Sequence, residues 1–214
     1  MSKFDDVIAG AGFGIAVGHA TDEAGGTGCT VIRGVDQPLR ASAFVFGRAT
    51  GSREIAILEP WASNDRIDAI LLTGGSAYGL DAAAGVMKWM EERGRGFAIG
   101  GGVVPIVPAA VVFDLAIIGR FDARPTPEMA YRACDSATPH GWAEGSVGVG
   151  TGCTVGKALG PARAMKGGFG IGMCGGNPIA CGFSAVNAVG HVRALDARIV
   201  ADSRRPSRHQ RSTV

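Results

Sequence analysis

Glycine is the feature of this sequence that most restricts its fold. The 214 residues include 35 glycines, roughly one residue in six against about 7% in an average protein. The glycines follow no three-residue period, which excludes a collagen-like helix. Hydrophobic residues make up 46% and charged residues 19% of the chain, a balance that excludes global disorder. The sequence therefore predicts tightly packed sheets with many turns and close backbone approaches.

Charge and cysteine content restrict the partners and the compartment. The formal net charge is +2, and residues 201–214 contribute +3 of it, which leaves the body of the chain near −1. A near-neutral body argues against a nucleic-acid partner. The five cysteines form no C-x-x-C pair, so we expect no disulfide framework, no metal site and no cofactor. We expect a cytoplasmic protein without a membrane partner, because no apolar run is long enough to span a bilayer and the start of the chain is unlike a signal peptide.

Apolar patterning divides the chain into strands and helices. Apolar runs bounded by Gly, Asp or Pro predict strands at residues 14–20, 28–33, 42–47, 67–73, 146–157, 167–173 and 179–189. A helical pattern covers residues 77–93 and stops at Gly94, and Pro125 or Pro127 opens a second helix. We expect one domain over residues 1–201 and a basic, disordered tail over residues 202–214.

A hexapeptide occurs twice in the chain. The sequence Gly-Thr-Gly-Cys-Thr-Val stands at residues 26–31 and again at residues 150–155. Two copies do not make a repeat architecture. We expect two related strands in comparable places, in two facing sheets. The alternative is a chance recurrence in a chain rich in Gly, Thr and Val.

Two segments match or resemble phosphate-binding motifs in sequence but lack features that those motifs need. Residues 170–175 match G-x-G-x-x-G, but Asn177 and Pro178 follow where a helix would have to begin. Gly156 and Lys157 resemble the end of a P-loop, yet Ala158 replaces the hydroxyl residue that would hold Mg²⁺. Neither pattern predicts a nucleotide site. The four histidines show no metal-ligand spacing.

Ser76 lies where a strand passes into a helix, in the sequence Gly-Gly-Ser-Ala-Tyr. An α/β-hydrolase carries its nucleophile at such a junction, within G-x-S-x-G. In that motif the second glycine lets the turn pack tightly. Here Tyr78 stands in its place. We therefore favour an N-cap role for Ser76 over a nucleophilic one.

Alternation along two of the predicted strands singles out Lys157 and Asn187. The odd positions of residues 179–189 are apolar except for Asn187, and those of residues 147–157 end in Lys157. Burial disfavours the charged form of a lysine, so it can accept a proton from a hydroxyl, and an asparagine N–H can stabilise an oxyanion. The structural alternative is that Lys157 extends to solvent and Asn187 caps a turn. The pattern alone favours this alternative.

Six segments of the chain resemble the P1 family of peptidases. They lie at residues 17–22, 25–32, 72–81, 104–115, 147–157 and 185–192. The family includes the L-aminopeptidase/D-Ala-esterase, the β-aminopeptidases and the 6-aminohexanoate-oligomer hydrolases. The resemblance implies an α/β fold, a four-layered αββα sandwich like that of N-terminal-nucleophile hydrolases. It also implies a precursor that cleaves itself, so that a Ser or Thr becomes the nucleophile at the start of a downstream chain.

The resemblance assigns roles to single residues. Lys157 matches the lysine of the nylon-hydrolase branch, and Asn187 matches the oxyanion-site asparagine. Phe113 stands where some members have a tyrosine, so that hydroxyl is missing here. After Asp202 the sequence leaves the family pattern, and Ser212 and Thr213 lie too soon after Asn187 to match the nucleophile. We expect an upstream-chain fragment with an incomplete sandwich.

These observations predict a peptidase or amidohydrolase that acts on small peptides, amides or esters. The expected partners are a downstream chain that carries the nucleophile and further copies in a homo-oligomer, and we expect the chain alone to be inactive. A non-catalytic remnant or binding subunit is the alternative. A Ser76-dependent esterase is a weaker one.

Overall fold

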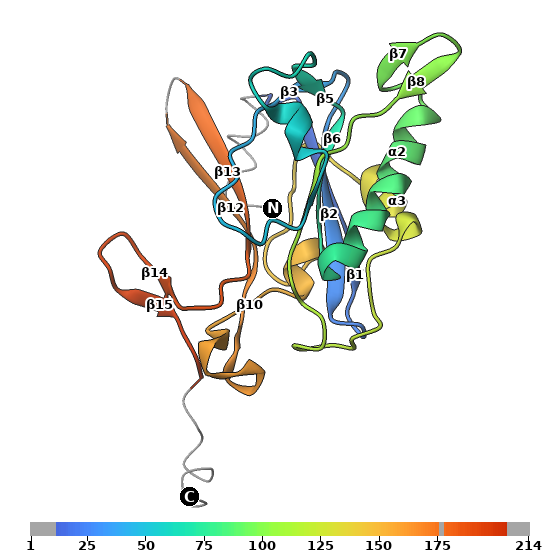
Figure 1. Ribbon diagram of the computed structural model, residues 1–214. Helices are drawn as coiled ribbons and strands as arrows, with labels where there is room; N and C mark the ends of the chain where they lie inside the picture. The colour runs from blue at the N-terminus through green and yellow to red at the C-terminus, as the bar shows by residue number, and fades with distance from the viewer. Residues whose placement is uncertain (1–11, 176–177, 205–214) are drawn as a thin grey trace, which may run out of the picture.

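The fold is built around a five-stranded sheet. The computed structural model describes residues 12–204 except 176–177 (Figure 1). The strands of the sheet, in spatial order, are β1 (Ile15–Asp22), β2 (Thr27–Gly34), β6 (Ala69–Thr73), β9 (Ala109–Val111) and β4 (Ser52–Arg53). Neighbouring strands are antiparallel except β6 and β9, which are parallel. The strands predicted at residues 14–20, 28–33 and 67–73 are thus present, the last divided at Asp68 into β5 (Arg66–Ile67) and β6.

Helices cover one face of this sheet. The predicted helix at residues 77–93 forms a 3-10 segment, η2 (Ser76–Ala82), that continues into α2 (Ala83–Glu91). Pro127 opens α3 (Pro127–Asp135), whose N-cap Thr126 accepts a hydrogen bond from the Met129 N–H at 3.3 Å. The two α-helices pack closely because Gly85 carries no side chain: a Cβ there would overlap the Pro127 carbonyl.

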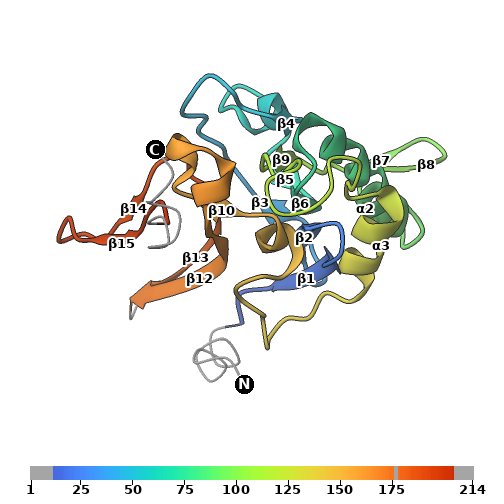
Figure 2. The same ribbon diagram turned by 90° about the horizontal axis from the view of Figure 1, so that it is seen from below.

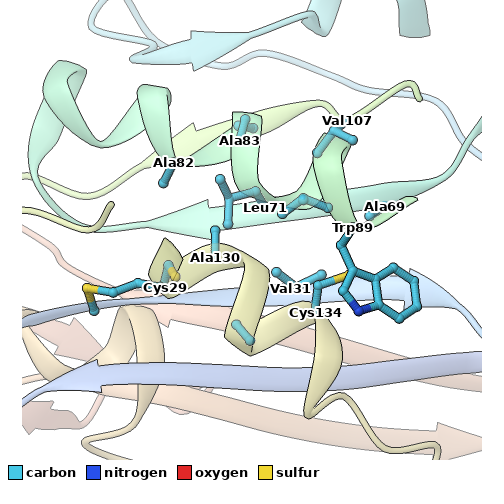
Figure 3. Close-up of a cluster of buried hydrophobic side chains, with 14 of the residues drawn as sticks. Cys29, Val31, Ala69, Leu71, Ala82, Ala83, Trp89, Val107, Ala130 and Cys134 are labelled. Atoms are coloured by element: carbon cyan, nitrogen blue, oxygen red, sulfur yellow. The ribbon is translucent and has the colours of Figure 1, made fainter. Parts of the chain in front are cut away.

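The helix-side core joins α2, α3 and the sheet (Figure 3). Cys29 and Val31 of β2 and Leu71 of β6 are fully buried against the helices. The next residues along these strands, Ile32 and Leu72, point to the other face and belong to a second cluster. The alternation of β2 and β6 therefore buries both faces of the sheet.

A β-hairpin covers the second face. Its strands are β12 (Gly168–Gly175) and β13 (Ile179–Val186), and Phe169 and Ile171 pack against Val17 and Ile32 of the sheet. Figures 1 and 2 show the helices and the hairpin on opposite sides of the sheet. Helix layer, sheet and hairpin correspond to three of the four predicted αββα layers. Both α-helices of the described residues belong to one layer.

Shorter elements complete the fold. They are β3 (Leu39–Arg40), η1 (Ile55–Leu58), β7 (Phe97–Ile99), β8 (Gly102–Val104), η3 (Gly148–Thr151), β10 (Thr154–Val155), η4 (Lys157–Leu159), η5 (Pro161–Arg163), β11 (Met165–Lys166), β14 (Val192–Arg193) and β15 (Ile199–Ala201). No helix among the described residues is long and apolar enough to cross a membrane. Of the predicted tail, residues 205–214, with Ser212 and Thr213, lie outside the described residues.

Two strand predictions are wrong. Residues 42–47 form no strand, and Phe44 and Phe46 are 88% and 93% exposed. A short apolar run alone predicted that strand, but no neighbouring strand pairs with the segment. Residues 146–157 contain η3 and only the two-residue strand β10. The positive φ of 51° at Gly148 turns the chain there, next to Thr30 and His19.

The prediction that the two hexapeptide copies form equivalent strands is therefore wrong. Residues 26–31 enter β2, whereas residues 150–155 leave η3 and end in β10. The residue just before the second copy nevertheless contacts the first copy: the Val149 N–H donates to Thr30 Oγ1 at 3.1 Å. The G-x-G-x-x-G run at residues 170–175 lies within β12, in the hairpin.

Candidate active site

Lys157 and Asn187 contact each other directly. Lys157 begins η4, after Gly156 has turned the chain with a φ of 67°, and Asn187 follows the last residue of β13. Lys157 Nζ donates to Asn187 Oδ1 at 2.8 Å and lies 3.2 Å from the Asn187 carbonyl oxygen. The fold thus joins two side chains that are 30 residues apart in the sequence.

Thr154 completes a closed set of hydrogen bonds around this pair. Lys157 Nζ lies 2.6 Å from the Thr154 carbonyl oxygen and 3.1 Å from Thr154 Oγ1, and the Thr154 N–H donates to Asn187 Oδ1 at 2.9 Å. Asn187 Nδ2 donates to the Phe113 carbonyl oxygen at 2.9 Å. These contacts fix the amide with its oxygen toward the lysine and its nitrogen toward Phe113.

Burial lowers the pKa of Lys157 below the usual range of a lysine. The oxygens around Nζ act in the opposite direction because they accept hydrogen bonds from the ammonium form. The ammonium has three N–H groups and four oxygen neighbours, so it acts only as a donor in the free site. Lys157 is half-buried, and Ala158 and Leu159 beside it are exposed, so the pair lies near the surface.

The alternation that pointed to these two residues holds for one strand only. In β13 the odd positions through Ala185 are half-buried and the even ones through Ser184 are exposed, as predicted. Lys157 lies in a 3-10 turn rather than at the end of a long strand. The turn brings it to Asn187 by a different route from the predicted one.

Asp114 is a buried acid that the pattern analysis did not single out. Its Oδ2 accepts from Thr27 Oγ1 at 2.7 Å and its Oδ1 from the Gly75 N–H at 2.7 Å, and burial raises its pKa. Asp114 follows Phe113, whose carbonyl holds Asn187. It thereby ties the β6–η2 turn to the backbone beside the pair. A lone carboxylate in the apolar run 103–115 is the signal that was available in the sequence.

Lys166 is a second lysine that the sequence did not single out. Its Nζ donates to the carbonyls of Gly150 at 2.6 Å and Cys153 at 3.2 Å, and burial lowers its pKa. Lys166 pairs with Thr154 across β10 and β11. It therefore supports the turn from which Thr154 reaches the Lys157–Asn187 pair.

Ser76 is not the N-cap that the sequence favoured. Gly75 is the N-cap, with a φ of 79° and no side-chain cap bond, and Ser76 is the first residue of η2. Ser76 itself has a φ of 53°, in the left-handed region that few non-glycine residues adopt. This backbone resembles a nucleophile turn. The side chains described around it do not include a histidine hydrogen-bonded to its hydroxyl, and the esterase role stays a hypothesis.

Metal ligation has no candidate cluster here. Among the described residues, no three His, Cys, Asp or Glu side chains group as metal ligands would. All five cysteines are free thiols, and burial raises the pKa of Cys29 and Cys134 to about 12 and of Cys153 to about 11.

Comparison with known proteins places this chain in a family. A family model for Peptidase family S58 matches residues 13–172. An uncharacterized aminopeptidase of Mycobacterium leprae is 50% identical over 127 residues, 58% of this chain and 34% of that protein. A 6-aminohexanoate-oligomer endohydrolase of Kocuria sp. is 33% identical over 149 residues, 67% of this chain and 38% of that protein. The L-aminopeptidase D-Ala-esterase/amidase structure from Ochrobactrum anthropi, described as a variant of the Ntn hydrolase fold, matches with a TM-score of 0.54 and 18% identity over 65% of this chain and 42% of that chain.

The chain belongs to peptidase family S58, and the resemblance predicted from its motifs is confirmed. This family is described as a family of peptidases. The structural match confirms the α/β fold of the N-terminal-nucleophile type. The chain spans about a third of the length of the curated relatives it matches.

Proposed function

We propose that this chain supplies the lysine and asparagine of an acyl-transfer site that removes N-terminal residues from peptides or cleaves small amides and esters. The observation that carries the proposal is the contact of 2.8 Å between Lys157 Nζ and Asn187 Oδ1. Each side chain has a separate part in the reaction. The two site roles rest on the family resemblance together with this geometry.

Lys157 is proposed as the general base. A hydroxyl that attacks an amide carbonyl must lose its proton as the new C–O bond forms, and a neutral amine can take it. Burial lowers the pKa of Lys157, which raises the neutral fraction near pH 7. The nucleophile must displace one of the oxygens that now accept from Nζ. Thr154 Oγ1 has the longer of the two Thr154 contacts, at 3.1 Å against 2.6 Å for the carbonyl.

Asn187 is proposed as an oxyanion donor. Its Nδ2 carries two N–H groups, of which one donates to the Phe113 carbonyl. The second is the donor that the carbonyl oxygen of the substrate would use as it becomes negative. The contacts of Oδ1 with Lys157 and Thr154 hold the amide in place before the substrate arrives, as preorganised stabilisation of the transition state requires.

The nucleophile is proposed to come from a downstream chain. Thr154 has a hydroxyl 3.1 Å from Lys157 Nζ, but it is 1% exposed, so a substrate does not reach it. The family resemblance implies instead a Ser or Thr that self-cleavage leaves at an N-terminus. Its hydroxyl would attack the amide carbon, the leaving amine would gain a proton, and water would release the acyl group.

Release of p-nitroaniline from alanine p-nitroanilide tests this proposal. We expect no turnover by the 214-residue chain alone, and turnover when a family-type downstream chain that begins with Ser or Thr associates with it. Lys157→Ala or Asn187→Ala in that mixture should lower the rate by about 100-fold or more. Lys88→Ala, which removes an exposed lysine of α2, is the matched control and should leave the rate unchanged.

Lys157→Arg separates a base from a fixed charge. Arginine keeps the positive charge but stays protonated at any working pH, so the mixture should remain inactive with this variant. Full turnover with Lys157→Arg would reject the general-base role. An associated mixture without turnover would favour the non-catalytic alternative, and turnover by the chain alone that survives both alanine substitutions would contradict the site assignment.

A further inference from the structure

A cavity of about 860 Å³ opens between the η2 segment and the chain that leads into α3. This volume is in the range of small-molecule sites. Tyr78 and Asp81 line one part of it, and Asp122 and Arg124 another. Lys157 and Asn187 are not among the residues that line it.

Two arginines line this cavity without an acidic partner. Arg53 and Arg124 have no carboxylate within 4.0 Å among the residues that the structure describes, whereas Asp122 pairs with Arg120 at 3.1 Å. Arg53 donates to Met87 Sδ at 3.1 Å, and a thioether is a weak acceptor. Both guanidinium groups therefore keep donors for an anionic ligand.

Arg124 is held in place by its neighbours. Its guanidinium carbon lies 3.5 Å from the centre of the Tyr78 ring and 5.6 Å from that of Phe121. Ala123 and Pro125 on either side of it are buried. Its Nε is buried and has no hydrogen-bond partner in the described part of the chain. Because Nε is buried, the donors left for a ligand are those of the two terminal nitrogens, which can hold a carboxylate through two parallel hydrogen bonds.

We propose that this cavity binds a free amino acid or short peptide, with Arg124 and Arg53 on its carboxylate and Asp81 near its ammonium group. Asp81 lines the same cavity and has no cationic partner among the described side chains. The lining holds two arginines and two aspartates, but Asp122 is already paired with Arg120, which lies outside the lining. The two arginines therefore face one unpaired acid, which suits a ligand held mainly by its carboxylate. This site does not depend on the proposed catalytic function.

Calorimetric titration of the whole chain with L-leucine, L-leucinamide and inorganic phosphate tests the proposal. L-leucine should bind at least about tenfold more tightly than L-leucinamide, which lacks the carboxylate. Arg124→Gln and Arg53→Gln should each weaken leucine binding about tenfold. Arg48→Gln, at an exposed arginine outside the cavity, is the charge-matched control, and Lys157→Ala should bind leucine normally.

Two results would overturn the assignment. Equal affinity for leucine and leucinamide would show that no carboxylate is recognised, as would unchanged leucine binding in both arginine variants. Phosphate binding tighter than leucine binding would reject the amino-acid ligand. Arg124→Lys guards against misfolding, because it keeps the charge over Tyr78 but loses the guanidinium fork: with an unchanged melting temperature it should also bind leucine more weakly.

Discussion

The two copies of Gly-Thr-Gly-Cys-Thr-Val share their burial but not their backbone. Cys29 and Cys153 both have no exposed surface, and Val31 and Val155 are 0% and 1% exposed. Yet the first copy pairs with two strands through β2, and the second contains a 3-10 turn and two residues of strand. The local sequence determined which side chains are buried, and the neighbouring elements determined the backbone.

The copies also differ in what their second threonine contacts. In the first copy Thr30 Oγ1 lies 2.9 Å from His19 Nδ1 and accepts from the Val149 N–H, which links β2 to η3. In the second copy Thr154 contacts Lys157 and Asn187. The first copy is thus a structural element and the second part of the candidate site. Asp114 touches both, through Thr27 Oγ1 and beside Gly152.

The largest effect is expected at Gly28 in the first copy. A Cβ there would overlap the carbonyl oxygens of Gly148 and Ala20, and backbone atoms move less easily than side chains. Gly28→Ala should lower the free energy of unfolding by about 3 kcal/mol or more, measured by urea denaturation. Gly170→Ala, at a β12 glycine with open space around it, should change it by less than about 0.5 kcal/mol. Equal effects would refute the close packing of the first copy.

Acid should lower the free energy of unfolding through His19, whose ring contacts Thr30 of the first copy. Burial lowers the pKa of His19 from 6.5 to about 4, so the unfolded chain binds this proton more readily than the folded one. The contribution to stability is therefore complete above pH 6.5 and is lost as the pH falls toward 4, by on the order of 3 kcal/mol at most. His19→Gln should remove this part of the pH dependence of unfolding. His140→Gln, at an exposed histidine, should preserve it.

The first threonines of the two copies, Thr27 and Thr151, should differ in how much a substitution by valine lowers the free energy of unfolding. Thr27 Oγ1 donates to the buried Asp114 at 2.7 Å, whereas Thr151 Oγ1 lies 3.5 Å from the Ser146 carbonyl, at the limit of a hydrogen bond. Thr27→Val should cost about 2 kcal/mol because it takes a donor from a buried carboxylate. Thr151→Val should cost less than about 0.5 kcal/mol. Similar losses in thermal or urea unfolding would show that the two copies are energetically alike.

Sequence patterns predicted the strands that pair over several residues better than the segments that do not. Where strands pair over several residues, as β1, β2 and β6 do, the predicted apolar runs are largely buried. The helix stop predicted at Gly94 coincides with its φ of 64°. The strand prediction for the second hexapeptide was wrong because its glycines allow a tight turn as readily as a strand. Strand propensity depends on residue type alone, so it could not predict that Gly148 and Gly150 lie against other backbone segments.

The candidate site was predicted only in part for a related reason. Lys157 and Asn187 were identified by type and by family resemblance, but their contact depends on the η4 turn and on the end of β13. Asp114 and Lys166 act through backbone groups, the Gly75 N–H and the carbonyls of Gly150 and Cys153. Such partners are set by tertiary structure and leave no motif in the sequence.

Titration of the lysine side chains by NMR tests the central claim most directly, namely that the second copy builds a base at Lys157. Burial should lower the pKa of Lys157, whereas the hydrogen bond to Glu92 should raise that of the exposed Lys88. The account predicts that Lys157 deprotonates at a lower pH than Lys88, and Lys157→Ala assigns its signal. A Lys157 that deprotonates together with Lys88 or at a higher pH would contradict the account.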